Sequence, residues 1–412
     1  MTNQRCKGAR DLLPEDTERF RHIEDAFRRS CLGWGYREVR TPTLEYLHLF
    51  TAAGTLTPSM LSKVYSFLDW DGWSGERVVL RPDGTIPVAR LYIENLAQED
   101  IARLFYVTNV FAFEETGKED RERWQCGVEL LGSAKAAADV ELILLAVEIL
   151  RSLDISGVEI QLSHAGMLKA LLKELKLSPD EEANLLTQIL DGNWQVLKQM
   201  PSGNADANRL LSSLLDLKGK SSGSLENLKA LREISFDLKS QLDNFAEVAS
   251  LLDVLDCNYR IDITATRGFE YYTGICFQLS AKEDKIGGGG RYDNLVPLIG
   301  GKSTAACGLA LYLDPLMNLV QPKAQQKTAQ RIVVSGETTT PEIMKASFQL
   351  AQSLREAGYV TELDFSGRPP NRRWVVTVQE QPSPFIIVDQ AQNQKREAST
   401  MANVIKIIGG SA

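Results

Sequence analysis

Only a few residues of this chain belong to the types that usually carry catalysis or bind metals. The three histidines, His22, His48 and His164, have no nucleophile near them in a familiar motif such as G-x-S-x-G. The six cysteines include no C-x-x-C pair, so no zinc-ligand spacing can be assembled with three histidines. These patterns predict structural histidines, reduced and buried cysteines, no metal and no catalytic residues.

Two glycine-rich segments have some features of phosphate-binding loops. The run Gly287-Gly-Gly-Gly-Arg-Tyr-Asp fails the G-x-G-x-x-G pattern in both registers, because Tyr292 and Asp293 stand where the last glycine is needed. Gly301-Lys-Ser lacks the first glycine of a Walker loop, since that position holds Val296. A glycine run between strands is usually a turn. We therefore predict no nucleotide cofactor from these segments.

The composition describes a chain that can fold around a sizeable core. Its 412 residues are 43% apolar and carry 46 Lys and Arg against 54 Asp and Glu, a net charge of −8. This length favours two or three domains. The acidic balance argues against general nucleic-acid binding, which needs clustered positive charge. The N-terminal residues contain no apolar signal segment and the most apolar helix carries three acidic residues, so we expect a cytoplasmic protein without membrane spans.

Apolar periodicity predicts the elements that must position any site. Phe20, Ile23, Phe27 and Cys31 recur at spacings of three and four, which predicts a helix that ends at Gly33. A long antiparallel hairpin is expected where residues 105–113 and 124–131 alternate in polarity. Further strands are predicted at residues 36–40, 77–80, 259–264, 271–279 and 305–311, and further helices at residues 138–153 and 314–320.

The same patterns divide the chain into parts. Residues 166–254 have a helical pattern and predict a helical insertion within a core that spans residues 1–320. We expect the strands on both sides of this insertion to share one sheet. Residues 321–330 have the composition of a linker, and residues 331–412 alternate between strand and helix as a small α/β domain.

Five separated segments, in their order and spacing, resemble histidyl-tRNA synthetase and its relatives over about residues 5–320. They are Gly8-Ala-Arg-Asp-Leu-Leu-Pro, Gly35-Tyr-Arg-Glu-Val-Arg-Thr-Pro, Arg81-Pro-Asp-Gly-Thr, Gln125-Cys-Gly-Val-Glu, and Arg267-Gly-Phe-Glu-Tyr-Tyr-Thr-Gly together with Gly288-Gly-Gly-Arg-Tyr-Asp. The resemblance implies an α+β fold of the class II aminoacyl-tRNA synthetase type, an antiparallel sheet flanked by helices. It also implies a dimer formed through residues 35–42.

The resemblance carries over a histidine pocket, residue by residue. The matching positions are Asp83, Thr85, Gln125, Glu129, Arg267, Tyr271 and Tyr272. The first three would accept hydrogen bonds from the α-ammonium group of histidine. Glu129 and Tyr272 match positions that bind the imidazole edge, and Arg267 matches a position near the carboxylate, with Tyr271 adjacent. Asp83 replaces the Glu usual in the family, so its contact with the ammonium is expected to be longer or bridged by water.

The ATP side departs from the family pattern. The signature F-R-x-E, which the family follows with a second Arg, reads Phe111-Ala-Phe-Glu-Glu here, so Ala112 and Glu115 replace two arginines. In the signature G-L-E-R, Ala310 and Leu311 replace the acidic residue and the Arg. A methyl group cannot donate to a phosphate, and each lost oxyanion donor costs roughly 10²- to 10³-fold in rate. We expect no efficient aminoacylation.

A synthetase core with an amino-acid pocket and a missing ATP site resembles the regulatory subunits of ATP phosphoribosyltransferase, which are synthetase paralogues of histidine biosynthesis. The resemblance implies a chain without catalysis that joins a short-form catalytic subunit in a hetero-octamer. That complex performs the first step of histidine biosynthesis, and histidine is its feedback inhibitor.

The C-terminal segment and the alternatives complete the expectations. Residues 321–412 carry 11 basic and 8 acidic residues, a net charge of +3, which is slight for gripping a tRNA stem. This part resembles a degenerate anticodon-binding domain, and we expect no tRNA partner. Two other functions remain open: an active histidyl-tRNA synthetase with an atypical ATP site, and a free-standing histidine-binding sensor or scaffold.

Overall fold

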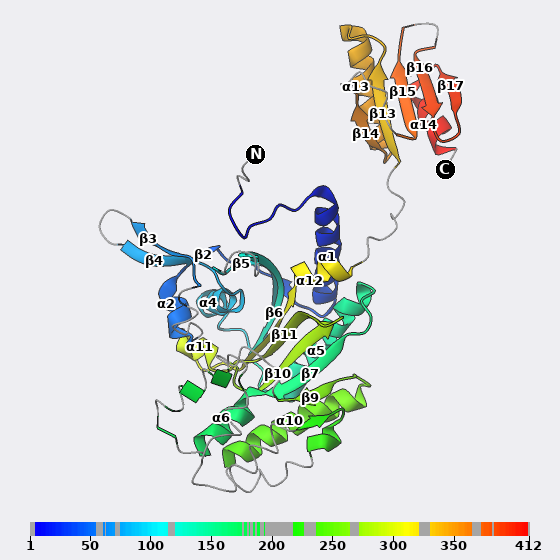
Figure 1. The fold of residues 1–412 in the computed structure, drawn as a ribbon. Helices are drawn as coiled ribbons and strands as arrows, with labels where there is room; N and C mark the ends of the chain where they lie inside the picture. Colours follow the sequence, from blue (N-terminus) through cyan, green and yellow to red (C-terminus); the bar gives the residue numbers. More distant parts are fainter. Residues whose placement is uncertain are drawn as a thin grey trace. The chain divides into compact units, whose positions relative to one another are not determined.

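A computed structural model shows the fold of the chain. It describes residues 5–54, 61, 63–70, 75–113, 120–174, 177–178, 181, 184–185, 188–189, 193, 217–225, 236–263, 272–320, 330–364, 372–380 and 383–410. The chain divides into two compact units, Met1–Gln321 and Pro322–Ala412 (Figure 1).

The larger unit is built on one sheet, which has nine strands within the described part of the chain. In spatial order these are β1 (Arg37–Glu38), β5 (Ala102–Phe111), β6 (Glu122–Leu131), β12 (Ala306–Tyr312), β11 (Asp284–Arg291), β10 (Ile275–Ala281), β7 (Glu159–His164), β9 (Arg260–Asp262) and β8 (Lys218–Gly219). Neighbouring strands are antiparallel except for the parallel pairs β1–β5 and β7–β9. Strands from both sides of the insertion therefore share one sheet, as predicted.

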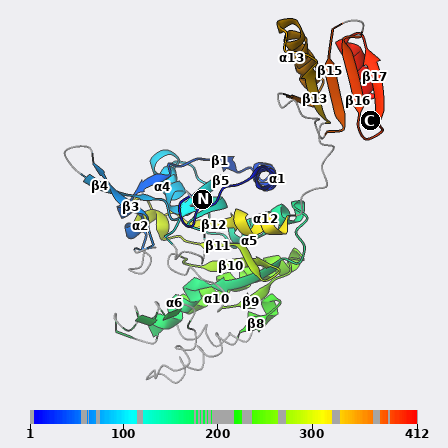
Figure 2. The ribbon, with the colours of Figure 1, turned by 45° about the horizontal axis from the view of Figure 1, so that its top comes forward.

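Helices cover both faces of this sheet (Figures 1 and 2). One face packs against α1 (Pro14–Gly33), α5 (Ala136–Ser152), α10 (Phe236–Val254) and α12 (Leu313–Leu319), and the other against α2 (Leu47–Ala52), α4 (Thr85–Asn95) and α11 (Leu295–Leu298). The predicted apolar stripe of α1 is buried in the first of these cores. The α+β architecture expected from the class II resemblance is confirmed.

Strand β6 shows how the sequence assigns residues to the two faces. Cys126, Val128 and Leu130 are buried in the core beneath α1 and α5. Because successive side chains of a strand point to opposite faces, Gln125 and Glu129 face the side that carries α4. Gln125 and Glu129 therefore lie on the same face of the sheet.

The glycine run is a strand and not the turn that the sequence suggested. Residues 287–290 pair with β10 on one side and β12 on the other. A Cβ atom at Gly288 would lie 2.7 Å from the carbonyl oxygen of Phe277, and one at Gly290 would lie 2.6 Å from that of Ile275. The run is glycine because neighbouring backbones approach too closely for side chains.

The insertion contains two long described helices, α6 (Ala165–Glu174) and α10, while most of residues 175–235 lie outside the described part. Two short elements were not predicted: β7, which directly precedes the insertion, and the two-residue strand β8 within it, which pairs with β9. His164 is fully buried at the end of β7, and its Nδ1 accepts from the amide of Met167 at 3.1 Å. Burial lowers the pKa of His164 to about 4, which fits the structural role predicted for it.

A three-stranded antiparallel sheet stands beside α4. Its order is β2 (Leu44–Tyr46), β4 (Gly75–Leu80), β3 (Ser66–Trp70). Every residue of β3 is exposed, including Phe67, Leu68 and Trp70. Apolar side chains in such a position are typical of a surface that another protein covers.

The smaller unit has a five-stranded mixed sheet with two helices. The strand order is β14 (Val360–Leu363), β13 (Arg331–Gly336), β15 (Trp374–Val378), β16 (Phe385–Asp389) and β17 (Gln394–Ala398), and the helices are α13 (Pro341–Glu356) and α14 (Met401–Gly409). The sequence pattern predicts strands at residues 331–334, 360–363, 374–378 and 385–388 and a helix at residues 341–357, but not β17 or α14. Ile332, Leu350 and Trp374 are buried together in its core.

Two further observations concern the chain as a whole. Among the described residues, no helix has both the length and the apolar character needed to cross a membrane. All six cysteines are free thiols, but Cys6 is exposed and Cys257 is half-buried, so the prediction that all are buried was wrong for these two. Cys6 lies in the N-terminal segment before α1, which has no apolar periodicity to bury it.

Candidate ligand-binding site

Four of the predicted pocket residues line one small cavity on the α4 side of the large sheet. Asp83 and Thr85 lie at the start of α4, Gln125 on β6, and Tyr272 just before β10. The cavity has a volume of about 80 Å³, and we call it the inner chamber. Residues that are more than 180 positions apart in the chain thus meet at one place, as the resemblance implied.

Glu129 lies behind the wall of the inner chamber and is almost completely buried. The hydroxyl group of Tyr106 donates to its Oε1 at 3.1 Å, and the hydroxyl group of Tyr292 donates to its Oε2. Burial raises the pKa of Glu129 to about 8, although these hydroxyl groups lower it. A buried carboxyl group with two donors is well placed to accept a further hydrogen bond from a ligand N–H.

Two glycines make room for this arrangement. Tyr106 lies opposite Gly127 in the β5–β6 pair, and a Cβ atom at Gly127 would overlap its ring. A Cβ atom at Gly308, on β12, would overlap the carboxylate of Glu129. Gly127 belongs to the Gln125-Cys-Gly-Val-Glu segment. This motif thus supplies two polar side chains and, between them, a residue without a side chain that leaves room for the Tyr106 ring.

Asp83 has a structural contact as well as a place in the inner chamber. Its Oδ1 accepts from the backbone amide of Ile86 at 2.9 Å, which caps the first turn of α4. Burial raises the pKa of Asp83, and the amides of Ile86 and Thr85 lower it. The second carboxylate oxygen is the acceptor that the prediction assigns to an ammonium group.

Sequence reasoning missed several residues of the chamber, and two predicted residues cannot be placed. Arg267 and Tyr271 lie outside the described residues. The wall residues that were not predicted are Gly288, Gly289, Tyr292, Gly308, Leu309 and Tyr312, and Tyr106 lies behind them. Tyr292 could have been found, because it belongs to the glycine-rich segment that carries the resemblance, whereas Tyr106 looks like any aromatic strand residue.

A larger cavity adjoins the inner chamber. It has a volume of about 450 Å³ and shares Gln125 and Tyr312 with it, and we call it the outer chamber. Its wall also includes Pro82, Val110, Asp120, Arg123, Trp124, Lys285, Asp314 and Pro315. The two chambers share these wall residues, and together we call them the cleft; its inner end is lined mainly by polar groups, and its outer end bears charges of both signs.

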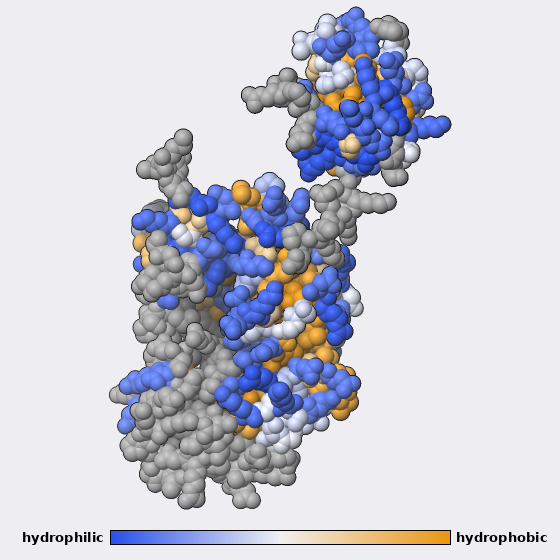
Figure 3. Space-filling model, turned by 45° about the vertical axis from the view of Figure 1, so that its right-hand side comes forward, coloured by the Kyte–Doolittle hydropathy of each residue, from blue (hydrophilic) through white to orange (hydrophobic). Residues whose placement is uncertain are grey.

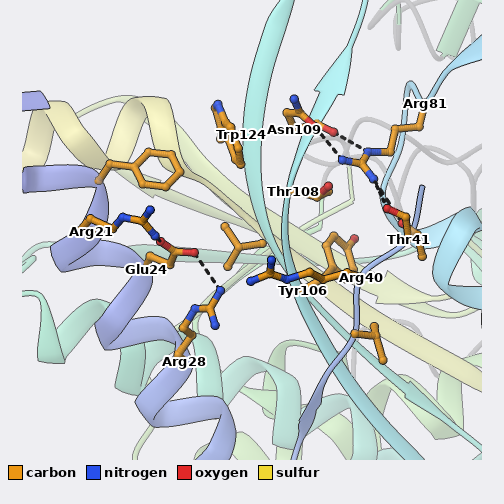
Figure 4. A pocket seen from close by; sticks show the side chains of 13 residues that line it. Arg21, Glu24, Arg28, Arg40, Thr41, Arg81, Tyr106, Thr108, Asn109 and Trp124 are labelled. Carbon is orange, nitrogen blue, oxygen red and sulfur yellow. Dashed lines mark hydrogen bonds and ion pairs between the residues drawn. The ribbon is translucent and has the colours of Figure 1, made fainter. Parts of the chain in front are cut away.

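A separate hollow of about 320 Å³ lies between α1, β1 and β5 (Figure 4). Four arginines line it, Arg21, Arg28, Arg40 and Arg81. Glu24 pairs with the first two at 2.6 and 2.9 Å. Arg81 is buried and donates to the carbonyl oxygen of Thr41 at 2.9 Å and to Oδ1 of Asn109 at 2.7 Å. Arg81 thus fixes the segment 35–42 against β5, and the dimer expected through this segment stays a prediction.

Comparison with known proteins places this architecture in a family. The family model described as histidyl-tRNA synthetase matches residues 8–316. A histidine–tRNA ligase of Methanocaldococcus jannaschii is 32% identical over 374 residues, 89% of this chain and 86% of that protein. A Bacillus halodurans crystal structure, titled as an ATP phosphoribosyltransferase regulatory subunit/histidyl-tRNA synthetase, has a TM-score of 0.78 and 24% identity and covers 93% of this chain and 100% of its own.

A second relative decides between the branches of this family. The ATP phosphoribosyltransferase regulatory subunit of Dehalococcoides mccartyi is 44% identical over 409 residues, 98% of each protein. The chain belongs to the family of ATP phosphoribosyltransferase regulatory subunits.

The predicted ATP-site positions can now be located in this regulatory-subunit fold. Ala310 lines the inner chamber, and Leu311, the next residue, is buried in the apolar core on the opposite face of the sheet. Ala112 directly follows β5, and Glu115 lies outside the described residues. No group of three metal-ligating side chains is found among the residues that the structure describes.

Proposed function

We propose that this chain is the non-catalytic regulatory subunit of an ATP phosphoribosyltransferase and that it binds histidine in the inner chamber. Histidine bound there inhibits a short-form catalytic subunit, which performs the first step of histidine biosynthesis. Family membership supports the role, and the convergence of Asp83, Thr85, Gln125 and Tyr272 in front of buried Glu129 supports the ligand.

The chemistry of the inner chamber fits histidine. An ammonium group needs several acceptors close together, and Asp83, Thr85 and Gln125 supply them from two elements. An imidazole ring needs a partner for its N–H group in a confined space, which Glu129 provides behind the chamber wall. A buried acidic side chain is costly to fold, so its retention favours a ligand that pairs with it.

Inhibition requires that the chamber be coupled to the partner. Histidine must bind one arrangement of the assembly more tightly than another, with a coupling free energy of order 1 to 3 kcal/mol. We propose a hetero-octamer in which this chain also forms dimers through residues 35–42. The C-terminal unit, with its net charge of +3, is proposed to be an anticodon-binding-like domain without a tRNA partner.

Exposed apolar surface supports a role within an assembly. Seen from the side of α1, α5 and α12, the larger unit shows an apolar band bordered by hydrophilic residues (Figure 3). A groove of about 280 Å³ beside α5 is lined by Val147, Leu150, Ile155 and Val158. Apolar surface of this kind is typical of proteins that are covered by a partner.

Calorimetric titration of histidine tests the ligand assignment. The chain should bind histidine, and Glu129→Gln should weaken binding by about tenfold to a hundredfold, because a ligand N–H can draw the carboxyl group into its charged form, whereas a carboxamide stays neutral. Glu159→Gln, at an exposed position of β7, is the matched control and should bind like the wild type. Equal affinity of wild type and Glu129→Gln would overturn the pocket assignment.

Turnover measurements test the role. The purified chain should stimulate a short-form catalytic subunit that consumes ATP and phosphoribosyl pyrophosphate, and histidine should reverse that stimulation. Histidine binding without any effect on the catalytic subunit would instead favour a free-standing sensor.

A further inference from the structure

The hairpin of β3 and β4, which we call the arm, exposes apolar side chains on both of its faces. Phe67, Leu68 and Trp70 are 45%, 57% and 67% exposed. Because side chains alternate along a strand, Phe67 lies on one face of the arm and the other two lie on the opposite face. The two strands project from the body of the larger unit (Figure 1). A projecting hairpin that is apolar on both faces is suited to insertion into a surface of another protein.

The arm also carries two acids in an unfavourable arrangement. Asp69 on β3 lies directly opposite Glu76 on β4, and both side chains are exposed. Among the residues that the structure describes, neither carboxylate has a hydrogen bond or an ion pair. Like charges that face each other across a strand pair destabilise it. A positively charged partner surface would remove this repulsion.

The hollow between α1, β1 and β5 is such a surface. Four arginines and one acid, Glu24, stand in the described part of its wall (Figure 4). Glu24 and Glu38 are the carboxylates that pair with three of the arginines, and Arg81 donates to uncharged oxygen atoms. Positive charge is therefore in excess. The side chains of Arg21 and Arg40 are 68% and 79% exposed, so a partner can reach them.

The arm and the hollow both adjoin the segment proposed to form the dimer. Arg40, within residues 35–42, lines the hollow, and Arg81, which also lines it, directly follows the last residue of β4. Phe20 and Trp124 give the hollow an aromatic side, with their ring centroids 5.0 Å apart. A two-fold dimer presents the same surfaces on both chains, so each arm can meet a hollow of the other chain.

We propose that, in a dimer of this chain, the arm of each protomer lies in the arginine-lined hollow of the other. Asp69 and Glu76 then meet the excess guanidinium charge, and the apolar side chains of β3 are removed from water. The inference rests on the dimer proposed above and adds a second pair of contacts to residues 35–42. It does not depend on the assignment of histidine to the inner chamber.

Charge reversal of the two surfaces, separately and together, tests the proposal. The arm variant combines Asp69→Lys with Glu76→Lys, and the hollow variant combines Arg21→Glu with Arg40→Glu. The exchange variant carries all four substitutions. All four residues have exposed side chains, so each variant is expected to fold, which far-ultraviolet circular dichroism checks.

Sedimentation velocity of the full chain over a concentration series gives the dissociation constant of the dimer. The arm variant and the hollow variant should each weaken the dimer about tenfold to a hundredfold, because like charges then meet across the interface. The exchange variant should recover most of the wild-type affinity, since the arm and the hollow have exchanged signs. The control combines Glu159→Lys with Glu247→Lys, at exposed positions of β7 and α10, and should dimerise like the wild type.

Three results would overturn the inference while leaving histidine binding untouched. An arm variant that dimerises like the wild type would show that the arm lies outside the interface. An exchange variant no better than the arm or hollow variant would show that these surfaces are not partners. An arm variant that stays dimeric but no longer stimulates the short-form catalytic subunit would assign the arm to that subunit. A monomeric wild type would overturn the proposed dimer together with this inference.

Discussion

The two ends of the cleft differ in how their polar groups are held. At the inner end, Glu129 is buried with two tyrosine hydroxyl groups bound to it, and two glycines keep the surrounding space open. At the predicted ATP side, Ala112 stands where the resemblance implies a guanidinium group, and Leu311, a second such position, lies in the apolar core on the opposite face of the sheet. A buried carboxyl group opposes folding, whereas an alanine or a leucine does not. If histidine binds as proposed, the inner end is the part that its ligand maintains.

The largest effect expected from this contrast concerns ATP. Three predicted losses of an Arg, at Ala112, Glu115 and Leu311, each with a cost of roughly 10²- to 10³-fold, should keep histidine-dependent ATP–pyrophosphate exchange at least about 10³-fold below that of a histidyl-tRNA synthetase. Ala112→Arg alone should not restore exchange, because Ala310 and Leu311 remain unchanged. A synthetase assayed in parallel is the positive control. Exchange at ordinary synthetase rates would show that the ATP side is functional and that the two ends do not differ in this way.

The second prediction concerns the stability cost of Glu129. The usual pKa of 4.5 is raised to about 8 in the folded chain, so the folded state holds one more proton between these pH values. The free energy of unfolding should therefore fall as pH rises through this window, by about 3 kcal/mol between pH 4.5 and pH 7. Glu129→Gln keeps an acceptor and has no proton to lose, so it should be the more stable protein at pH 7.

Urea unfolding at pH 5, 6, 7 and 8 checks this dependence. The difference between Glu129→Gln and the wild type should be near zero at pH 5 and should grow with pH. The Glu159→Gln control should follow the wild type throughout. Parallel curves for Glu129→Gln and the wild type would mean that the buried carboxyl group imposes no such cost.

Several features of this contrast could be predicted from the sequence. The alternating pattern of β6 places Gln125 and Glu129 on one face of the sheet. The apolar stripe of α1 indicates the hydrophobic core on the opposite face. Asp83 and Thr85 were assigned from the short segment Arg81-Pro-Asp-Gly-Thr that carries the resemblance. These features depend on residues that are close together in the chain, so local patterns carry them.

Features that depend on contacts between distant strands could not be predicted. The glycine run became β11 because its neighbours β10 and β12 approach closely, and no local pattern records that approach. Tyr106 reaches Glu129 only because Gly127 lies opposite it in the hairpin. The outer chamber combines Arg123 and Lys285 from strands about 160 positions apart, and neither residue stands in a motif.

A third prediction tests the space kept open at the inner end. Gly308→Ala would place a methyl group against the carboxylate of Glu129. The substitution should weaken histidine binding by about tenfold and lower the free energy of unfolding by about 1 to 3 kcal/mol, as is usual for overpacking. Gly33→Ala, where a Cβ atom meets nothing within 4 Å, is the control. Unchanged histidine affinity in Gly308→Ala would show that this space does not serve the ligand.

The smallest effect is expected where the insertion contacts the inner chamber. Lys169 on α6 donates from its Nζ to the carbonyl oxygen of Tyr272 at 2.8 Å, and Tyr272 lines the chamber. Lys169→Met keeps most of the side-chain volume but loses this bond, so Tyr272 should be less firmly placed. We expect histidine affinity to fall about threefold to tenfold, which corresponds to one hydrogen bond of about 1 kcal/mol.

One turn further along α6 lies the matched control for this last effect. Lys173 is exposed and is 3.8 Å from Asp237, another exposed residue, so Lys173→Met should leave histidine affinity unchanged. If Lys169→Met also binds histidine normally, Tyr272 is held by its own strand and the insertion does not influence the chamber. If only Lys169→Met loses affinity, the insertion is mechanically joined to the inner end. By linkage, histidine should then protect the amides of α6 against hydrogen exchange.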